Sequence, residues 1–288
     1  MKKFGRDGVY FFWSISIVLS MLVALFVLGF ASCAKGNAAP SGSKAPSGSK
    51  APATASSSPE AEASPSTSPQ GSTAPVSSPT SGSTESVLAE TADMGKEYVD
   101  KFIFLGDSTT YGLGYYDVVD DSQVWTPASG TLTLSLWSTS TIVYPDDKSE
   151  ISIKDAVTQK QPEYMLITLG VNGISFMDEQ YFVTEYTKLV QAIKEASPNT
   201  KIILNSIYPV TAGYSEKDNG ITNEKIDAAN VWVARVANSL GVKYLDSESV
   251  IKDETGALPD KYCNGDGLHL NTDGFNLIIN YLRTHGYQ

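Results

Sequence analysis

The sequence predicts an α/β fold in which a mostly parallel central β-sheet lies between two layers of helices, as a three-layer sandwich with a small inserted β-hairpin. Short apolar runs with the composition of buried parallel strands alternate with longer segments of helical periodicity. The helical segments are bounded by polar residues, proline or glycine, which are typical signals for helix ends. Alternating strands and helices of this kind build βαβ units.

Four apolar runs are expected to form the buried strands, because each is short and has a glycine, a proline or an aspartate within two residues of its end. The first leads into Gly106-Asp107-Ser108 and the second into Gly170-Val171-Asn172. The runs are residues 101–105, 164–169, 201–207 and 242–245.

Three longer segments, residues 179–196, 223–240 and 272–284, have the pattern of helices. Threonine and serine alternate with leucine in residues 131–136, which indicates an exposed strand. We expect that strand to pair in an inserted hairpin, with either residues 141–144 or residues 151–153.

The first 33 residues have the pattern of a signal sequence or a membrane anchor. Lys2, Lys3 and Arg6 precede an apolar stretch over residues 9–31, which is about long enough to cross a bilayer as a helix. The residues before Cys33 resemble the lipobox of bacterial lipoproteins, in which the cysteine is lipidated; an uncleaved single-span anchor is the alternative. Both interpretations predict a bacterial membrane protein whose remaining chain is extracytoplasmic, because positive residues stay in the cytoplasm.

Residues 34–86 have the composition of a disordered linker. They are rich in Ala, Ser, Pro, Gly and Thr, and Ala-Pro-Ser-Gly-Ser-Lys occurs twice in tandem, at 39–44 and 45–50. So little apolar surface does not offset the entropy of ordering the chain. The linker is expected to let the folded part reach the cell wall above the membrane, or to act as a passive spacer. Residues 87–288 are then one folded domain.

The charge of this domain argues against nucleic acid as a partner. Residues 1–86 hold six of the 21 Lys/Arg and four of the 32 Asp/Glu, which leaves 15 and 28 in the domain and a net charge of −13. Affinity for a phosphate backbone needs clustered cations. No metal or other cofactor is expected, because two separated histidines and one domain cysteine, Cys263, do not form a ligand cluster.

A serine, an aspartate and a histidine occur in the chain as Ser108, Asp266 and His269, and these three residue types form hydrolytic triads. Of the two histidines, His285 lies where the last helix ends and a cation is favourable, so His269 is the candidate base. Ser108 follows a predicted strand, and reactive groups gather beyond the carboxyl ends of parallel strands. Asp107 is expected to cap the next helix.

Three segments resemble the sequence blocks of the GDSL-type esterases, also called SGNH hydrolases. Phe104-Leu105-Gly106-Asp107-Ser108 is similar to the nucleophile block, Leu169-Gly170-Val171-Asn172 to the Gly-x-Asn block, and Asp266-Gly267-Leu268-His269 to the Asp-x-x-His block. The resemblance covers about residue 100 to the C-terminus and implies a flavodoxin-like hydrolase fold.

The resemblance also implies roles for the site residues. Ser108 would be the nucleophile, His269 the base and Asp266 the partner of His269. The oxyanion would be held by the Ser108 N–H, the Asn172 amide and the Gly130 N–H. For Gly130, a role as the turn glycine that opens the hairpin is an equally good interpretation. The sequence departs from the family pattern in two places: the oxyanion glycine has no unambiguous counterpart, and Gly173 replaces the aspartate that often follows the block asparagine.

The expected function is therefore an extracytoplasmic serine esterase acting on short O-acyl groups, most simply acetyl, of a cell-envelope or environmental carbohydrate or of a small ester. A lysophospholipase or thioesterase, and an inactive glycan-binding module, are the alternatives. A phosphodiesterase is disfavoured by the acidic domain. Five aromatic residues are candidates for stacking on sugar rings, although such residues more often build cores and anchor loops. They are Tyr111, Tyr115, Tyr116, Trp125 and Tyr214.

Overall fold

Five parallel strands form the central sheet, in the spatial order β2-β1-β5-β6-β7. The computed structural model describes residues 84–288, so the predicted anchor segment, Cys33 and residues 34–83 of the predicted linker lie outside the described residues. The four predicted strands are all present, with ends shifted by at most two residues. The strands are β1 (Phe102–Gly106), β2 (Val124–Trp125), β5 (Tyr164–Thr168), β6 (Lys201–Asn205) and β7 (Lys243–Leu245).

The order of the strands places a crevice beyond the ends of β1 and β5. Counted along the chain, the sheet has the order 2-1-3-4-5, a doubly wound arrangement. The chain runs from β1 to β2 and then crosses to the other side of β1 to form β5, so the connections after β1 and β5 diverge. Gly106 and Thr168, the last residues of these two strands, are register partners. The segments that follow both strands therefore start side by side.

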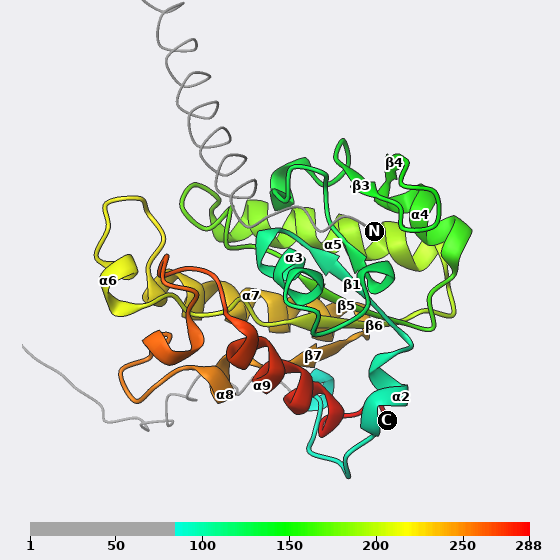
Figure 1. Cartoon of the computed structure of the whole chain (residues 1–288). Coiled ribbons are helices and arrows are strands. Elements are labelled where there is room, and N and C mark those ends of the chain that lie inside the picture. The colour runs from blue at the N-terminus through cyan, green and yellow to red at the C-terminus, as the bar shows by residue number, and fades with distance from the viewer. Residues whose placement is uncertain (1–83) are drawn as a thin grey trace, which may run out of the picture. The chain divides into compact units, whose positions relative to one another are not determined.

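Helices cover both faces of the sheet, as Figure 1 shows. Buried side chains of α4 (Ile153–Lys160), α5 (Glu179–Ala196) and α7 (Asn223–Leu240) belong to the core on one face. Those of α2 (Gly95–Val99), α3 (Ser108–Tyr115), α8 (Glu248–Ile251) and α9 (Thr272–Arg283) belong to the core on the other. The predicted three-layer α/β sandwich is confirmed. The remaining helices are α6 (Ala212–Ser215) and the 3₁₀ helices η1 (Thr84–Ser86), η2 (Asp121–Gln123), η3 (Leu134–Leu136) and η4 (Asp260–Tyr262).

The two long helices have the bounds predicted from the sequence because both carry strong end signals. Asp178 caps α5 and Thr222 caps α7, each by accepting the backbone N–H three residues on. At its other end α7 stops at Gly241, whose φ of 62° is left-handed and favours glycine. Local sequence alone is enough to define these elements.

The inserted hairpin is present, but the prediction of a strand over residues 131–136 is wrong. The hairpin pairs β3 (Thr141–Val143) antiparallel with β4 (Glu150–Ser152). Leu134–Leu136 instead forms η3, which packs against α5. Leu132 and Leu134 are fully buried, so the alternating leucines fill the core rather than one side of an exposed strand. Tertiary packing thus overrides the strand pattern.

The elements that the sequence did not predict include the edge strand β2 and helix α4. Trp125, in β2, is fully buried, so it belongs to the core and is not a candidate for stacking on a sugar ring. A two-residue strand is too short to show a periodicity of its own.

Between residues 84 and 288, no helix is both long and apolar enough to span a membrane.

Candidate active site

The turn after β1 places Ser108 at the N-terminus of helix α3. Gly106 ends the strand where a Cβ atom would lie 2.5 Å from the carbonyl oxygen of Thr168, so a larger residue would separate β1 from β5. Asp107 then caps α3, as predicted, by accepting the backbone N–H of Thr109 at 2.9 Å and its hydroxyl at 2.7 Å. Ser108 is the first residue of the helix, where backbone N–H groups lack helical acceptors.

The loop before α9 brings the predicted base to this serine. The Nε2 atom of His269 lies 2.8 Å from the Oγ atom of Ser108, which is 161 residues earlier in the chain. On the other side of the ring, Nδ1 lies 2.6 Å from Oδ2 of Asp266. A carboxylate can only accept, so Nδ1 carries the proton and Nε2 is left to accept the serine hydroxyl proton. The structure thus joins the three side chains in one hydrogen-bonded chain.

Backbone N–H groups of its own loop hold the Asp266 carboxylate in place. Its Oδ1 atom accepts the backbone N–H groups of Leu268 at 2.7 Å and His269 at 2.9 Å. Partial burial alone would raise the pKa of this carboxyl, but the hydrogen bonds from the His269 side chain and backbone outweigh it, so the pKa of Asp266 lies below its usual range. The carboxylate therefore stays charged beside the imidazole.

Cys263 supports the same loop from inside the domain. Its buried thiol lies 3.4 Å from the backbone nitrogen of Gly265 and 3.2 Å from that of Gly267, and its sulfur accepts both N–H groups. These glycines have φ values of 104° and 91°, a region that other residues rarely adopt. The sulfur therefore fixes a loop whose backbone conformation depends on glycine.

Asn172 lies in the turn after β5 and reaches across to the turn that carries Ser108. Its Nδ2 atom donates to Oδ2 of Asp107 at 3.0 Å and to the carbonyl oxygen of Leu132 at 3.3 Å. A side-chain amide has two N–H donors, so both have protein acceptors here. Asn172 is thus brought next to the nucleophile turn, and its hydrogen bond to Leu132 is the longer of the two.

Gly130 lies in a turn that uses its backbone N–H. Its backbone N–H donates to the carbonyl oxygen of Pro127 at 2.8 Å, and its φ of 71° is that of a turn glycine. An N–H used in a turn is not available to an oxyanion. The turn alternative for Gly130 therefore describes this structure, in which its N–H already has an acceptor.

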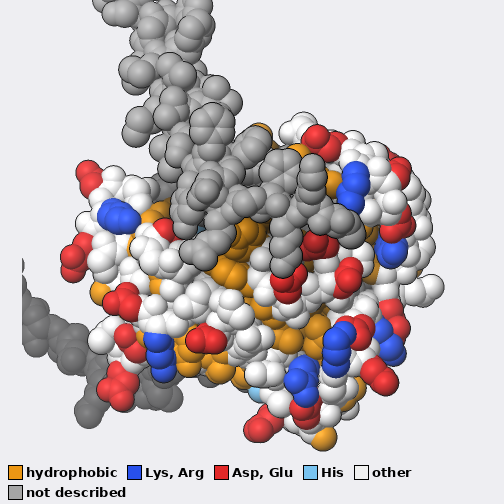
Figure 2. All heavy atoms as spheres, in the orientation of Figure 1, with side chains coloured by type: hydrophobic (Ala, Val, Ile, Leu, Met, Phe, Trp, Pro, Cys, Tyr) orange, Lys and Arg blue, Asp and Glu red, His pale blue; other side chains and the backbone are white. Residues whose placement is uncertain are grey.

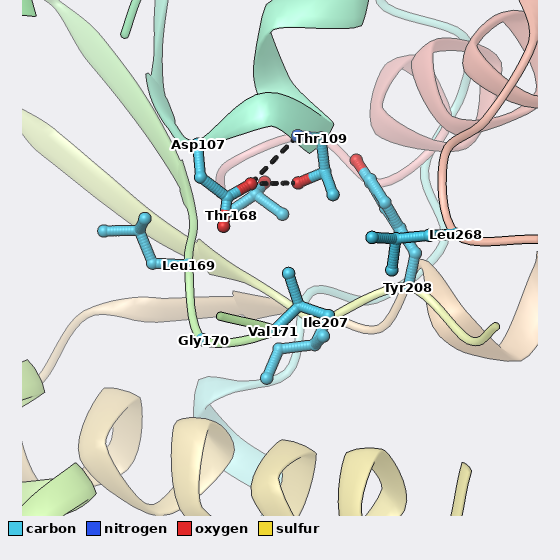
Figure 3. Close-up of a pocket in the computed structure, with 9 residues that line it drawn as sticks. All are labelled: Asp107, Thr109, Thr168, Leu169, Gly170, Val171, Ile207, Tyr208 and Leu268. Atoms are coloured by element: carbon cyan, nitrogen blue, oxygen red, sulfur yellow. Dashed lines mark hydrogen bonds between the residues drawn. The ribbon is translucent and has the colours of Figure 1, made fainter. Parts of the chain in front are cut away.

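Asp107 is fully buried and accepts the hydrogen bond from Asn172 that joins the two turns. The sequence did not reveal this bond. Burial raises the pKa of its carboxyl, and the hydrogen bonds from Thr109 act against this. A small cavity of about 10 Å³ lies beside it, with room for about one water molecule and not for an acyl chain. Figure 3 shows the lining side chains arriving from the ends of β1, β5 and β6 and from the histidine loop. They are Asp107, Thr109, Thr168, Leu169, Gly170, Val171, Ile207, Tyr208 and Leu268.

Comparison with known families identifies the chain. The model of the GDSL-like Lipase/Acylhydrolase family matches residues 104–277, more than half of the 288 residues. The chain belongs to this family. Acylhydrolases of this family cleave esters, and the matched segment spans all three residues of the hydrogen-bonded chain. No curated protein matches it.

Solved structures resemble this acylhydrolase in fold. A putative platelet activating factor from Streptococcus pneumonia has a TM-score of 0.50 at 19% identity, over 64% of this chain and 82% of the other. A GDSL-like lipase from Bacteroides thetaiotaomicron has 0.46 at 18%, over 66% and 88%. An acetylxylan esterase from Geobacillus stearothermophilus has 0.42 at 16%, over 68% and 97%. At these identities the first similarity supports the fold alone.

The acylhydrolase shows no metal-binding cluster in the described part of the chain. Within residues 84–288, no group of three or more His, Cys, Asp or Glu side chains could hold a metal ion. His285, the second histidine, lies at the end of α9, where its Nδ1 atom is 2.9 Å from the carbonyl oxygen of Tyr281. His269 and His285 therefore have separate surroundings, and only the first adjoins a serine.

Proposed function

We propose that this acylhydrolase is a serine esterase that removes short O-acyl groups, most simply acetyl, through an acyl-enzyme intermediate. The observation that carries the proposal is the chain of two hydrogen bonds from Asp266 through His269 to Ser108, at 2.6 and 2.8 Å. A nucleophile, a base within reach of it and a group orienting the base are the parts that acyl transfer requires.

The reaction follows from the positions of these atoms. Ser108 Oγ attacks the ester carbonyl carbon while His269 Nε2 takes the hydroxyl proton, and the charged Asp266 stabilises the imidazolium that forms. When the tetrahedral intermediate collapses, Nε2 gives this proton to the leaving alcohol oxygen. A water molecule then attacks the acyl-enzyme by the same route, and Ser108 recovers its proton.

Two donors support the oxyanion in this proposal. The backbone N–H of Ser108 lies at the start of α3, where the helix dipole favours negative charge. The second donor is Asn172, whose longer hydrogen bond, to the Leu132 carbonyl, would be exchanged for the oxyanion while the bond to Asp107 keeps the amide in place. Removing one donor of this type costs about 3–4 kcal/mol in the activation barrier.

The experiment compares the two histidines of the full-length chain, purified in mild detergent. Wild type should hydrolyse p-nitrophenyl acetate in the presence of EDTA, and Ser108→Ala and His269→Ala should abolish turnover. His285→Ala is the matched control and should retain it. Better turnover of p-nitrophenyl decanoate than of the acetate would favour a lysophospholipase, and better turnover of a thioester such as S-acetylthiocholine than of the acetate would favour a thioesterase. Absence of turnover above the Ser108→Ala background on every ester would favour an inactive binding module.

The location of the enzyme is a second part of the proposal, and it rests on the sequence of residues 1–83. We propose that the esterase is held at the extracytoplasmic face of the membrane, by a lipid on Cys33 or by the N-terminal apolar segment. Growth with a radioactive fatty acid should label the wild-type chain and not Cys33→Ala if the lipid is the anchor. An unlabelled wild type that stays in the membrane fraction identifies the helix as the anchor, and a fully soluble chain excludes both.

A further inference from the structure

The exposed side of helix α3 carries two tyrosines that follow the serine along the helix. Five of its eight residues are buried, whereas Tyr111 and Tyr115 are each 47% exposed. They stand three and seven residues after Ser108, a spacing that places all three on one side of an α-helix. The rise of an α-helix puts Tyr111 about 5 Å and Tyr115 about 10 Å along the axis from the serine.

The two rings form a supported surface rather than separate side chains. Their centroids are 6.1 Å apart and their planes differ by 30°. Tyr115 meets Tyr116 edge to face at 4.9 Å, and Tyr116 lies 6.0 Å from the buried Phe275 of α9. The surface is therefore connected to the core through aromatic contacts, which limits the conformational entropy lost when a ligand binds to it.

The position of α9 makes this surface possible. A Cβ atom on Gly112 would lie 2.5 Å from the ring of Phe275, so a glycine is required for the close approach of the two helices.

On the face in Figure 2, hydrophobic side chains reach the surface in the middle, over α3, with acidic side chains around them.

The surroundings favour a neutral, hydroxyl-rich ligand. Burial, and then the charge of Asp121, raise the pKa of Tyr111. Asp121 also packs against the same helix, because its Oδ1 atom would lie 2.5 Å from a Cβ atom added to Gly114. A carboxylate beside the rings repels phosphates and other anions but accepts hydrogen bonds from sugar hydroxyls. The cavity of about 10 Å³ beside Asp107 does not accommodate a long acyl chain. The exposed tyrosine rings offer a surface for the bulk of a substrate whose small acyl group lies at Ser108.

We propose that Tyr111 and Tyr115 form a carbohydrate-binding subsite, on which two sugar rings of a neutral glycan stack while an O-acyl group of the same chain reaches Ser108. This inference rests on the proposed esterase function for its orientation, because the acyl group fixes the end of the glycan. The apolar C–H face of a sugar ring packs on a tyrosine ring, and the hydroxyl groups stay in contact with water and Asp121. The subsite would make the enzyme select polymers over small esters.

The kinetic test uses partially O-acetylated xylohexaose and chitohexaose with the full-length chain. Tyr111→Ala and Tyr115→Ala should each raise the KM for the oligosaccharide about 3- to 10-fold, and the double variant by more, with kcat little changed. The value of kcat/KM for p-nitrophenyl acetate should stay at the wild-type level. Tyr111→Phe and Tyr115→Phe keep a ring and should keep the low KM. Tyr281→Ala, on α9 with its ring against His285, is the control for loss of a tyrosine elsewhere.

A binding test separates this subsite from the esterase function. In the Ser108→Ala background, calorimetry should show that the two tyrosine-to-alanine changes raise the Kd for the same oligosaccharides by the same factors. If wild type hydrolyses no ester, the proposed function fails, but this Kd comparison still decides the subsite. Unchanged KM and Kd, or no binding of either oligosaccharide, would overturn it. A loss confined to p-nitrophenyl decanoate would also overturn it, because the rings would then hold an acyl chain.

Discussion

The amide of Asn172 donates a hydrogen bond of 3.0 Å to the fully buried carboxylate of Asp107, the residue before the nucleophile. The bond joins the turn after β1 to the turn after β5, across the crevice at which the two chain connections diverge. Asp107 therefore has two tasks. One oxygen caps α3 through Thr109, and the other fixes the direction of the Asn172 amide.

Asp107→Asn tests whether Asp107 positions Asn172. Asparagine still caps a helix, so the fold should be kept, but its amide would replace the acceptor that Asn172 needs. We expect kcat on p-nitrophenyl acetate to fall about 10- to 100-fold with KM little changed, since an oxyanion donor would be misdirected. Asp117→Asn, an exposed position just after α3, is the matched control. A variant with wild-type kcat would show that Asp107 serves only as a cap.

Asp266→Asn should leave the chain folded and lower kcat by about 10⁴-fold, because an amide can hold the wrong imidazole tautomer. Asp273→Asn, in the exposed first turn of α9, should retain activity. The pKa of Asp266 is lower in the folded chain than its unfolded value of 3.8. The carboxylate therefore stabilises the fold at pH values above 3.8, and this contribution is lost as the pH falls below 3.8. The difference in unfolding free energy between wild type and Asp266→Asn should therefore shrink in acid. A constant difference between pH 7 and pH 3 would contradict the lowered pKa.

Cys263 should matter for activity through the loop and not through its own chemistry. Cys263→Ser keeps an acceptor for the N–H groups of Gly265 and Gly267, whereas Cys263→Val removes it at similar size. The valine variant should lose kcat several-fold more than the serine variant, with urea unfolding measured for both to separate stability from activity. Equal activity in the two variants would mean that the sulfur contacts are dispensable.

Glu248 predicts a pH-dependent stability that is independent of catalysis. Burial, and then the nearby Asp227, raise the pKa of Glu248 to about 7 from 4.5, and they outweigh the hydrogen bond from Asn230 and the charge of Lys252, whose Nζ atom lies 3.6 Å from Oε1 of Glu248. A raised pKa means that the folded state binds the proton more tightly, so stability is lost as pH rises from 4.5 towards 7. The loss should be at most about 3 kcal/mol. Urea unfolding at pH 5 and pH 8 should show this loss in wild type and in Glu254→Gln, an exposed control. Glu248→Gln should show a smaller loss, and an equal loss there would refute the assignment.

The sequence predicted the parts of the fold that depend on local signals. Asp178, Thr222 and Gly241 mark the ends of α5 and α7, and these bounds were correct to the residue. Leu132 and Leu134 show where local signals fail, because an alternating pattern looks the same on an exposed strand and in a segment that inserts both leucines into the core. The two-residue strand β2 depends wholly on its pairing with β1.

For the site, the chemistry of the residue types, the presence of only two histidines and the resemblance to the GDSL-type blocks together singled out Ser108, Asp266 and His269, which the structure brings into one hydrogen-bonded chain. Gly130 could not be assigned in the same way, because a turn glycine and an oxyanion glycine have the same local sequence, and only the acceptor of its N–H distinguishes them. The bond between Asp107 and Asn172 spans 65 residues and was not predictable from either block alone.

The first described residues join the sheet at the edge farthest from β2. Val87 forms a parallel bridge with Tyr244 of β7, and the N–H of Leu88 donates to the carbonyl oxygen of Tyr244 at 2.9 Å. Two strands, β5 and β6, separate this edge from β1. If the chain were pulled from its N-terminal side, the load would enter at β7 and peel this bridge first. The strands that lead to Ser108 and Asn172 would be mechanically shielded, so the site would keep its geometry while the chain on the N-terminal side of Val87 is under tension.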